Sequence, residues 1–148
     1  MKLKFALLAV LAIAALTLSA GAQNTSKVTA FTNPANTTGL PDTISNSGTT
    51  YLASRIFGSG TMAIQLNIVK VSGTVGGSAS LQASIDNGQS PTTWFAIPGT
   101  DTLTLADATQ VKSWVIPANY LHYRIRITTS GTQKNAPKAF YYLQNQYK

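Results

Sequence analysis

The sequence predicts an all-β protein, a single antiparallel β-sandwich of jelly-roll or immunoglobulin-like type with an extended N-terminal arm. Apolar and polar residues alternate with period two in several short segments, which is typical of half-buried strands. Gly, Pro and Asn separate these segments at short intervals, and helical periodicity is almost absent. The chain contains no Glu, and its polar residues are chiefly Thr, Ser, Asn and Gln, a composition that favours strands.

Residues 1–22 have the features of a secretory signal peptide. Two lysines precede an apolar run from Phe5 to Leu18 that is too short for a comfortable membrane span. Small residues end the segment, so Gln23 is the expected mature N-terminus, and the alternative is an uncleaved membrane anchor. We therefore expect an exported protein that has no stable membrane anchor after cleavage. It would be extracellular or on the cell surface.

Residues 23–50 form the expected arm, and residues 51–148 form the expected β-sandwich domain. The arm is rich in Thr, Asn, Ser, Gly and Pro, which favours turns and extended chain. Within it, residues 27–31 predict a short strand. The domain starts with a second predicted strand from Tyr51 to Phe57, and a glycine-containing turn follows it.

The stretch from Thr61 to Trp94 is expected to be the stability core of the domain. Two long strands, Met62–Val71 and Ser78–Asp86, are predicted to form a hairpin through the glycine-rich turn between them. In the first strand the apolar alternation changes phase at Ile68–Val69. This change indicates either a β-bulge or a strand that passes between two packing environments. In the second strand, four residues are expected to face the core: Ala79, Leu81, Ala83 and Ile85.

Further short strands are predicted after this hairpin, and Pro or Gly ends several of them. The longest, from Tyr120 to Thr129, is expected to turn Leu121, Tyr123, Ile125 and Ile127 inward. Residues 106–109 read as a loop or one helical turn, and residues 130–138 as a loop. The other predicted strands are Trp94–Ile97, Thr102–Leu105, Lys112–Ile116 and Ala139–Leu143.

A turn motif lies at the end of the central stretch. The sequence around Asp86, Asn87 and Gly88, followed by Trp94, resembles an Asp-box hairpin with a longer gap before the tryptophan. In that motif the aspartate accepts hydrogen bonds from turn amides and the aromatic ring packs beneath, so we interpret these residues as a structural turn. Carbohydrate or calcium binding is the alternative. Calcium is disfavoured because Asp86 has no acidic neighbour nearer than Asp101.

A basic and aromatic row is predicted on the outward face of the long strand: Tyr120, His122, Arg124 and Arg126. Such a row is either a solvated sheet face or a surface for a partner subunit, a phosphate or an acidic glycan. His122, the only histidine, is expected to face solvent, because no nucleophile motif accompanies it.

Composition excludes several classes of site. The chain has no cysteine, so thiolate metal sites and cysteine nucleophiles are absent. No cofactor or metal site is predicted, and we expect no enzymatic activity. The net charge is +7, but only 10% of residues are charged. So modest a charge is poor evidence for nucleic-acid binding, which requires many lysines and arginines clustered with aromatic residues on one face, and we expect none.

The last predicted strand is apolar on both faces: Phe140, Tyr141, Tyr142 and Leu143. It is either a central strand or a strand that packs against another subunit. With few charged residues to keep edge strands apart, we expect a homo-oligomer. The aromatic residues, which include Trp94 and Trp114, are expected to be mostly core, with a sugar-stacking platform as the alternative.

Three blocks of sequence resemble small β-sandwich proteins that tailed phages and prophages encode. The blocks are Ser80–Gly88 with Trp94–Leu105, Tyr120–Ile127, and Ser130–Thr132. The resemblance implies a structural component of a virion or surface, without catalysis. The leader departs from the usual virion pattern and indicates a product that is routed through a membrane. We therefore expect an exported structural subunit that associates with copies of itself or with other virion or surface proteins. The alternative is a secreted carbohydrate-binding module.

Overall fold

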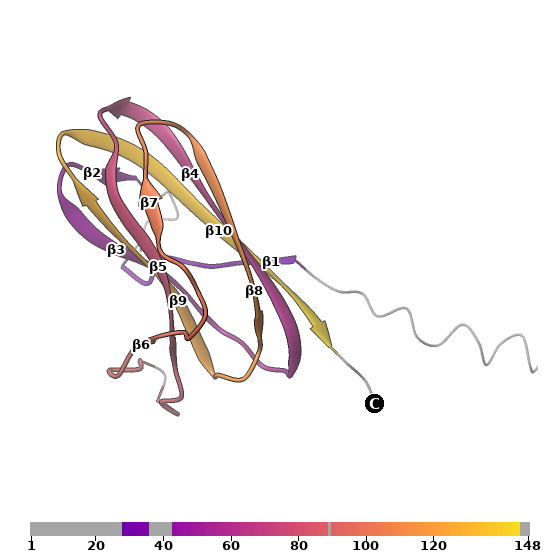
Figure 1. Ribbon diagram of the computed structural model, residues 1–148. Coiled ribbons are helices and arrows are strands. Elements are labelled where there is room, and N and C mark those ends of the chain that lie inside the picture. Colours follow the sequence, from indigo (N-terminus) through magenta and orange to yellow (C-terminus); the bar gives the residue numbers. More distant parts are fainter. Residues whose placement is uncertain (1–27, 36–42, 89, 146–148) are drawn as a thin grey trace, which may run out of the picture.

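The computed structural model describes residues 28–35, 43–88 and 90–145 of the chain, and its regular structure is entirely β (Figure 1). The strands are β1 Val28–Ala30, β2 Ile44–Ser45, β3 Gly48–Arg55, β4 Gly60–Gly73, β5 Gly76–Ser84, β6 Phe95–Ala96, β7 Leu103–Leu105, β8 Gln110–Pro117, β9 His122–Ser130 and β10 Gln133–Asn145.

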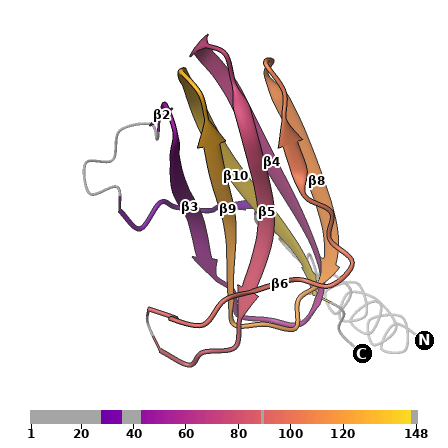
Figure 2. The same ribbon diagram turned by 60° about the vertical axis from the view of Figure 1, so that its left-hand side comes forward.

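The strands form two antiparallel sheets. Sheet A has the order β1-β10-β4-β8, and β2 also pairs with β10. Sheet B has the order β3-β9-β5-β6, and β7 also pairs with β5. In Figure 2, β3, β9 and β5 form one layer, and β10 and β4 form the layer behind it. The predicted β-sandwich is therefore confirmed.

The core fills the space between the two sheets. Sheet A contributes the inward residues of β4, from Met62 to Ile68, each at most 1% exposed. Sheet B contributes the inward residues of β9, of which Ile125 is fully buried. The indole nitrogen of Trp114 donates to the Asp101 carbonyl at 3.0 Å, which satisfies the one polar atom of this buried side chain. The alternation of apolar residues therefore predicted the inner faces of these strands correctly.

The expected hairpin between β4 and β5 is wrong, because the two strands lie in different sheets. β4 pairs with β8 and β10, whereas β5 pairs with β9, β6 and β7. Gly73 and Gly77 do adopt positive φ angles of 70° and 121°, but their turn carries the chain from sheet A to sheet B. A Cβ atom at position 77 would lie 2.1 Å from the Thr128 carbonyl oxygen, so this crossing requires glycine.

Of the two causes that the sequence suggested for the phase change at Ile68–Val69, the structure supports the second, because the strand passes here from the core into an exposed environment. The buried alternation simply ends at Ile68, and the next apolar residues, Val69 and Val71, are 42% and 52% exposed. The register with β10 shifts beyond this point, because Lys70 and Ser72 pair with adjacent residues of β10. The irregularity thus lies at Val71 rather than at Ile68–Val69.

The predicted core position of Ile85 is also wrong. β5 ends at Ser84, and the Ile85 side chain is 69% exposed. The chain leaves the sheet one residue before the apolar alternation ends, so the last apolar residue of the pattern projects from a loop. Leu81, on the same face of the pattern, is 1% exposed as expected.

The predicted loop over residues 130–138 is mostly strand. β10 starts at Gln133 and continues through Pro137, which pairs with Ile68 of β4. Proline is tolerated at this position because its missing N–H would point to the edge of β10 that faces β1 and β2, and not to β4. The carbonyl of Ala139 accepts a hydrogen bond from Phe31 across that edge, and Pro137, two residues earlier, faces the same way. β2 and β1 leave the edge unpaired at Pro137, so its missing N–H removes no ladder hydrogen bond.

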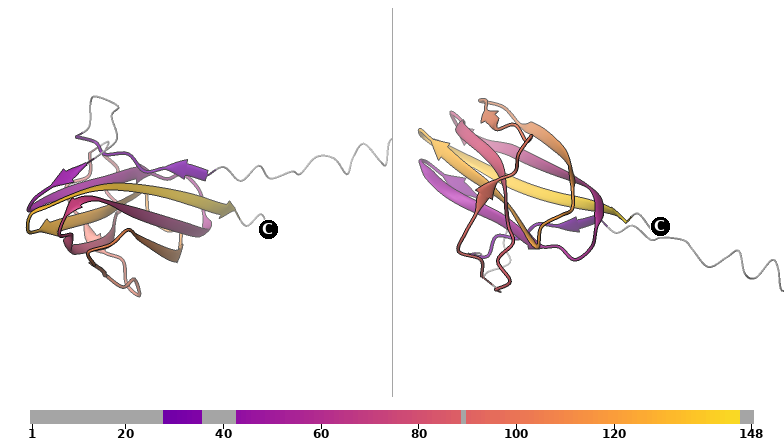
Figure 3. Two further views of the ribbon diagram at one scale, coloured as in Figure 1. Left: turned by 90° about the horizontal axis from the view of Figure 1, so that it is seen from above. Right: turned by 60° about the horizontal axis from the view of Figure 1, so that its bottom comes forward.

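The described parts of the stretch expected as an arm lie on the sandwich. β1 and β2 both pair with β10, and β1 lies beside the C-terminal end of that strand (Figure 3). Between them Phe31 is buried against Tyr141, with ring centroids 5.5 Å apart. Thr32 then bridges to Ala53 of β3, so this segment passes from the edge of sheet A to the edge of sheet B. The predicted signal peptide lies outside the described residues.

Candidate binding site on the outer face of sheet B

All three arginines and the single histidine of the chain gather on the outer side of sheet B. Arg55 on β3 is the direct cross-strand partner of His122 on β9. Arg124 and Arg126 follow on β9 with period two, and their β3 partners are Ala53 and Tyr51. Because paired residues of adjacent antiparallel strands project to the same face, the basic groups of two strands converge on one surface.

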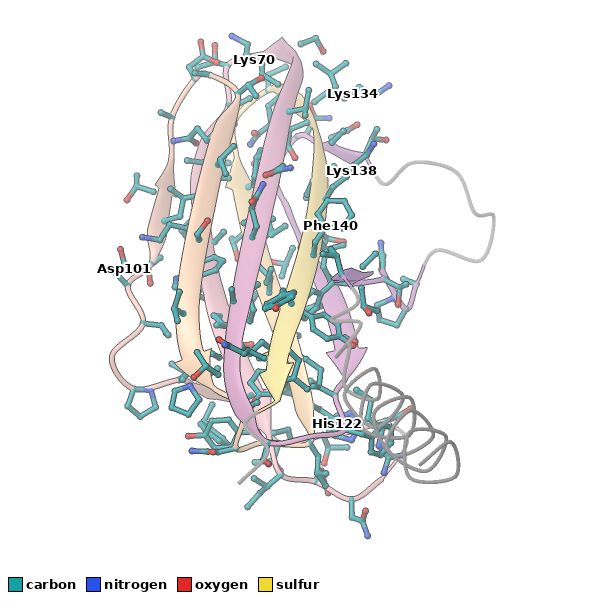
Figure 4. All side chains as sticks on the ribbon, turned by 90° about the vertical axis from the view of Figure 1, so that its right-hand side faces the viewer. Lys70, Asp101, His122, Lys134, Lys138 and Phe140 are labelled. Atoms are coloured by element: carbon teal, nitrogen blue, oxygen red, sulfur yellow. The ribbon has the colours of Figure 1, made fainter. Side chains whose placement is uncertain are left out.

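Three members of the predicted basic row therefore lie on one face, but they differ in exposure. Arg126 is exposed, Arg124 is half-buried and His122 is only 5% exposed. The expectation that His122 faces solvent is wrong. Its register neighbours are Arg55 and Ser84, and it lines a hollow together with Pro34 and Pro91. Figure 4 shows His122 at the end of the sandwich opposite Lys70 and Lys134.

Tyr120, the fourth member of the row, precedes β9 and is half-buried. Its ring makes edge-to-face contacts with Phe95 and Tyr123, at centroid distances of 5.2 and 5.9 Å. Its backbone nitrogen donates to the Tyr123 hydroxyl at 3.0 Å. Burial raises the pKa of Tyr123 above its ordinary value. Tyr120 thus packs against the edge of the core rather than extending the surface of Arg124.

The Arg124 side chain is held between two aromatic rings. Its guanidinium carbon lies 4.2 Å from the ring centroid of Trp94 and 4.3 Å from that of Tyr51. Its Nε donates to Gln82 Oε1 at 2.7 Å. Burial is the main cause that lowers the pKa of Arg124 from its ordinary value, but an arginine stays cationic at neutral pH. Stacking and this hydrogen bond fix the orientation of the guanidinium plane.

A hollow of about 450 Å³ lies beside this stack, and we call it the Arg124 hollow. Its volume is in the range of small-molecule sites. Ala53, with its small side chain, lies between the larger residues of β3 and β9. The full lining comprises Ala30, Thr32, Pro34, Tyr51, Ala53, Ser54, Arg55, Ser90, Pro91, Trp94, His122 and Arg124.

Two nitrogen atoms of the lining residues are buried without a hydrogen-bond partner among the described residues: Arg55 Nε and His122 Nε2. Each leaves a polar group removed from water, which costs free energy unless a partner is supplied. The Arg55 guanidinium also lies 4.8 Å from the centroid of the Phe57 ring. These unsatisfied groups belong to paired residues of adjacent strands, both of which line the hollow.

The turn motif positions the wall of this hollow. Asp86 Oδ2 accepts hydrogen bonds from the backbone nitrogen of Thr92 at 3.0 Å and from its hydroxyl at 3.3 Å. The first of these is the main cause that lowers the pKa of Asp86. The indole nitrogen of Trp94 donates to the Pro91 carbonyl at 2.9 Å. Asp86 therefore closes the loop that presents Trp94, whereas Asn87 and Gly88 are exposed and keep negative φ angles.

The predicted assembly strand lies in β10, where its residues alternate between the two faces of sheet A. Tyr141 and Leu143 pack against the core, and Phe140 and Tyr142 lie on the outer face, where Figure 4 shows Phe140. One cross-strand row of this outer face consists of Val28, Tyr142, Ala63 and Val115. Val28 and Val115 are 61% and 71% exposed. We call this row the sheet A patch.

Sequence reasoning did not find Tyr51 and Arg55 as members of the site. Both occur in the predicted strand from Tyr51 to Phe57, at a spacing of four that places them on one face. The sequence therefore indicated that Tyr51 and Arg55 share a face, but it did not indicate which strand pairs with theirs. Pairing of β3 with β9 brings the two residues beside Arg124.

Two searches of the described residues bear on other classes of site. No group of three or more His, Asp or Glu side chains lies within metal-binding reach there. In the same part of the chain, no helix is long and apolar enough to cross a membrane.

Comparison with known proteins yields only distant similarity. A scan against protein-family models found no match, and neither did a comparison with curated protein sequences. Among solved structures, the chain is similar to a carbohydrate-binding module of Cellvibrio mixtus lichenase 5A in complex with cellotriose. The identity is 16% and the TM-score 0.35, over 84% of this chain and 92% of that one. It is also similar to Arthrobacter globiformis T6 isomalto-dextranase complexed with panose, at 14% identity and a TM-score of 0.34. That match covers 64% of this chain and 16% of the dextranase, and at these values neither similarity carries an argument about function.

Proposed function

We propose that this protein is an exported, non-catalytic carbohydrate-binding module whose ligand lies in the Arg124 hollow. The observation that carries the proposal is the ordered stack of Tyr51, Arg124 and Trp94 beside two buried nitrogens that have no partner among the described residues. Sugars present apolar C–H faces and a rim of hydroxyl groups. A site for them therefore needs rigid aromatic surface next to unsatisfied polar groups, and this hollow supplies both.

The lining of the hollow supports binding rather than hydrolysis. Glycoside hydrolysis normally uses a pair of carboxylates, one on each side of the scissile bond. None of the described residues that line the hollow is an aspartate or a glutamate. Asp86, which closes the loop that presents Trp94, already accepts two hydrogen bonds from Thr92.

Replacing Trp94 tests the proposal. Trp94→Ala removes one ring of the stack, and we expect affinity for the bound polysaccharide to fall at least about tenfold, the loss typical of a central aromatic anchor. Affinity electrophoresis in gels that contain soluble polysaccharides gives a first screen, and calorimetry measures the affinity. Phe95→Ala is the matched control, because Phe95 is the next aromatic residue along the chain and does not line the hollow.

Equal losses in the two variants, or binding that survives Trp94→Ala unchanged, would contradict the assignment of the site. A wild-type protein that binds no polysaccharide in the screen would contradict the proposed function itself. Thermal melts of both variants separate loss of a contact from loss of the fold.

A second candidate function is self-association, as in a subunit of a virion or cell-surface assembly. The sheet A patch favours it, because one apolar row crosses β1, β10, β4 and β8 and ends in strongly exposed valines on both sides. A second copy of the chain offers the same uncharged row, and an isologous dimer buries the same surface of both copies.

Val115→Lys tests this candidate by adding a charge at the most exposed large side chain of the expected interface. We expect the oligomer to dissociate in light-scattering measurements at high protein concentration. Val71→Lys is the control, since Val71 is also exposed but lies outside the row. A wild-type protein that stays monomeric at high concentration and moderate salt would exclude this function and leave the carbohydrate-binding proposal in place.

A further inference from the structure

The charge of the Arg124 hollow is not balanced within the described residues. Arg55 and Arg124 are permanent cations, and the described lining contains no carboxylate. The described aspartates lie elsewhere: two pair with lysines, and Asp86 accepts hydrogen bonds from Thr92. Two guanidinium groups in a partly enclosed hollow repel each other unless an anion neutralises them, so the site favours a negatively charged ligand.

The geometry of Arg124 restricts how such an anion can bind. Trp94 and Tyr51 stack on the guanidinium, and Nε is used by Gln82. What remains is the edge formed by the two terminal amino groups, which make no hydrogen bond to a described residue. An arginine whose plane is fixed and whose edge is free matches a planar carboxylate, which accepts two parallel N–H bonds.

Arg55 and His122 supply a second point of attachment beside this edge. They are direct cross-strand partners, and each has a buried nitrogen without a partner among the described residues. His122 is only 5% exposed and lines the hollow, so water does not supply a partner to its unsatisfied nitrogen as it would at an exposed surface. Both nitrogens are also shielded from the space of the hollow, so a ligand oxygen reaches them only when neighbouring side chains move, and such a contact would relieve the cost of burying them.

We infer that the sugar held in the Arg124 hollow carries a carboxylate, as a uronic acid residue of an acidic polysaccharide does. The carboxylate lies against the free edge of Arg124 and the Arg55 side chain, and the sugar ring lies over the aromatic residues. This inference rests on the proposed carbohydrate-binding function and specifies the class of ligand.

Calorimetry with matched pairs of oligosaccharides tests the inference. The probes are trimers of galacturonate, glucuronate and mannuronate, each measured beside its own methyl ester, which keeps the sugar and removes the charge. At pH 7 and moderate salt we expect at least one free acid to bind about tenfold or more tightly than its ester. Arg55→Gln should reduce that advantage at least about fivefold, because it should weaken binding of the free acid more than binding of the ester. Arg124→Lys keeps the charge but loses the planar edge, and should also reduce the advantage.

Arg126→Gln is the matched control, because it removes the same charge from the same face of β9 at a residue that does not line the hollow. We expect it to change the preference by no more than about twofold at moderate salt, where exposed charges are screened. Equal affinity for acids and esters would overturn the inference and leave the carbohydrate-binding function standing. Equal losses in Arg55→Gln and Arg126→Gln would also overturn it, by showing that net charge alone attracts the ligand. Binding to vesicles of anionic phospholipid, with none to any saccharide, would overturn both the inference and the proposed function.

Discussion

The contrast between Leu81 and Ile85 provides the sharpest test of the fold. Both residues belong to one apolar alternation in the sequence, and both are expected from it to face the core. In the structure Leu81 is 1% exposed on the inner face of β5, whereas Ile85 is 69% exposed in the loop that follows. Replacement by alanine removes the same number of carbon atoms from Leu81 and from Ile85, so the two variants differ chiefly in how deeply the removed atoms are buried.

We expect Leu81→Ala to lower the free energy of unfolding by about 2–5 kcal/mol, because it removes buried contacts and leaves a cavity between the sheets. Ile85→Ala should change it by less than about 0.5 kcal/mol, as is usual for an exposed side chain. For a domain of this size, about 4 °C in Tm accompanies each kcal/mol, so the first variant should melt roughly 8–20 °C lower.

Urea unfolding followed by tryptophan fluorescence gives the free energies, and circular dichroism gives the melting temperatures. If Ile85→Ala destabilises the protein as much as Leu81→Ala does, then β5 continues past Ser84. The loop from Ile85 to Trp94 would then be placed wrongly, and with it the wall of the Arg124 hollow. A small cost for Leu81→Ala would instead refute the assignment of the inner face of β5.

Three further outcomes are expected. Gly77→Ala should destabilise the protein by about 1–3 kcal/mol in urea unfolding, because a positive φ angle and a backbone contact exclude a Cβ atom there, whereas Gly48→Ala, with nothing within 4 Å, should cost little. Hydrogen bonds from lysines lower the pKa of Asp101 and Asp107 below their ordinary value of 3.8. The stability that these pairs contribute should therefore be fully present above that pH, and thermal melts in acid should show it being lost as the pH falls through the lowered pKa values. Stability that rises on acidification would contradict these pairings. Mass spectrometry of protein exported from a bacterial host should find Gln23 at the N-terminus, and a product that retains the first residue would refute the signal peptide.

The sequence by itself determined the fold class and the inner faces of the strands. An alternation with period two is a local property, since successive side chains of a strand point to opposite sides. It therefore identified Leu81 and Ile125 as core residues before any partner strand was known. The turn motif was also local, because Asp86 accepts its hydrogen bonds from a residue six positions away.

Only the tertiary structure decided which strands meet, and with them the site. Alternation is the same whether a strand pairs with its neighbour in sequence or with a strand of another sheet, so it did not separate β4 from β5. Burial of His122 and the approach of Arg55 to it depend on pairing between β3 and β9, which are far apart in the chain. The stack on Arg124 likewise joins rings from two distant segments. These contacts are non-local, and their register is set by the packing of the whole sandwich, so no pattern within one strand contains them.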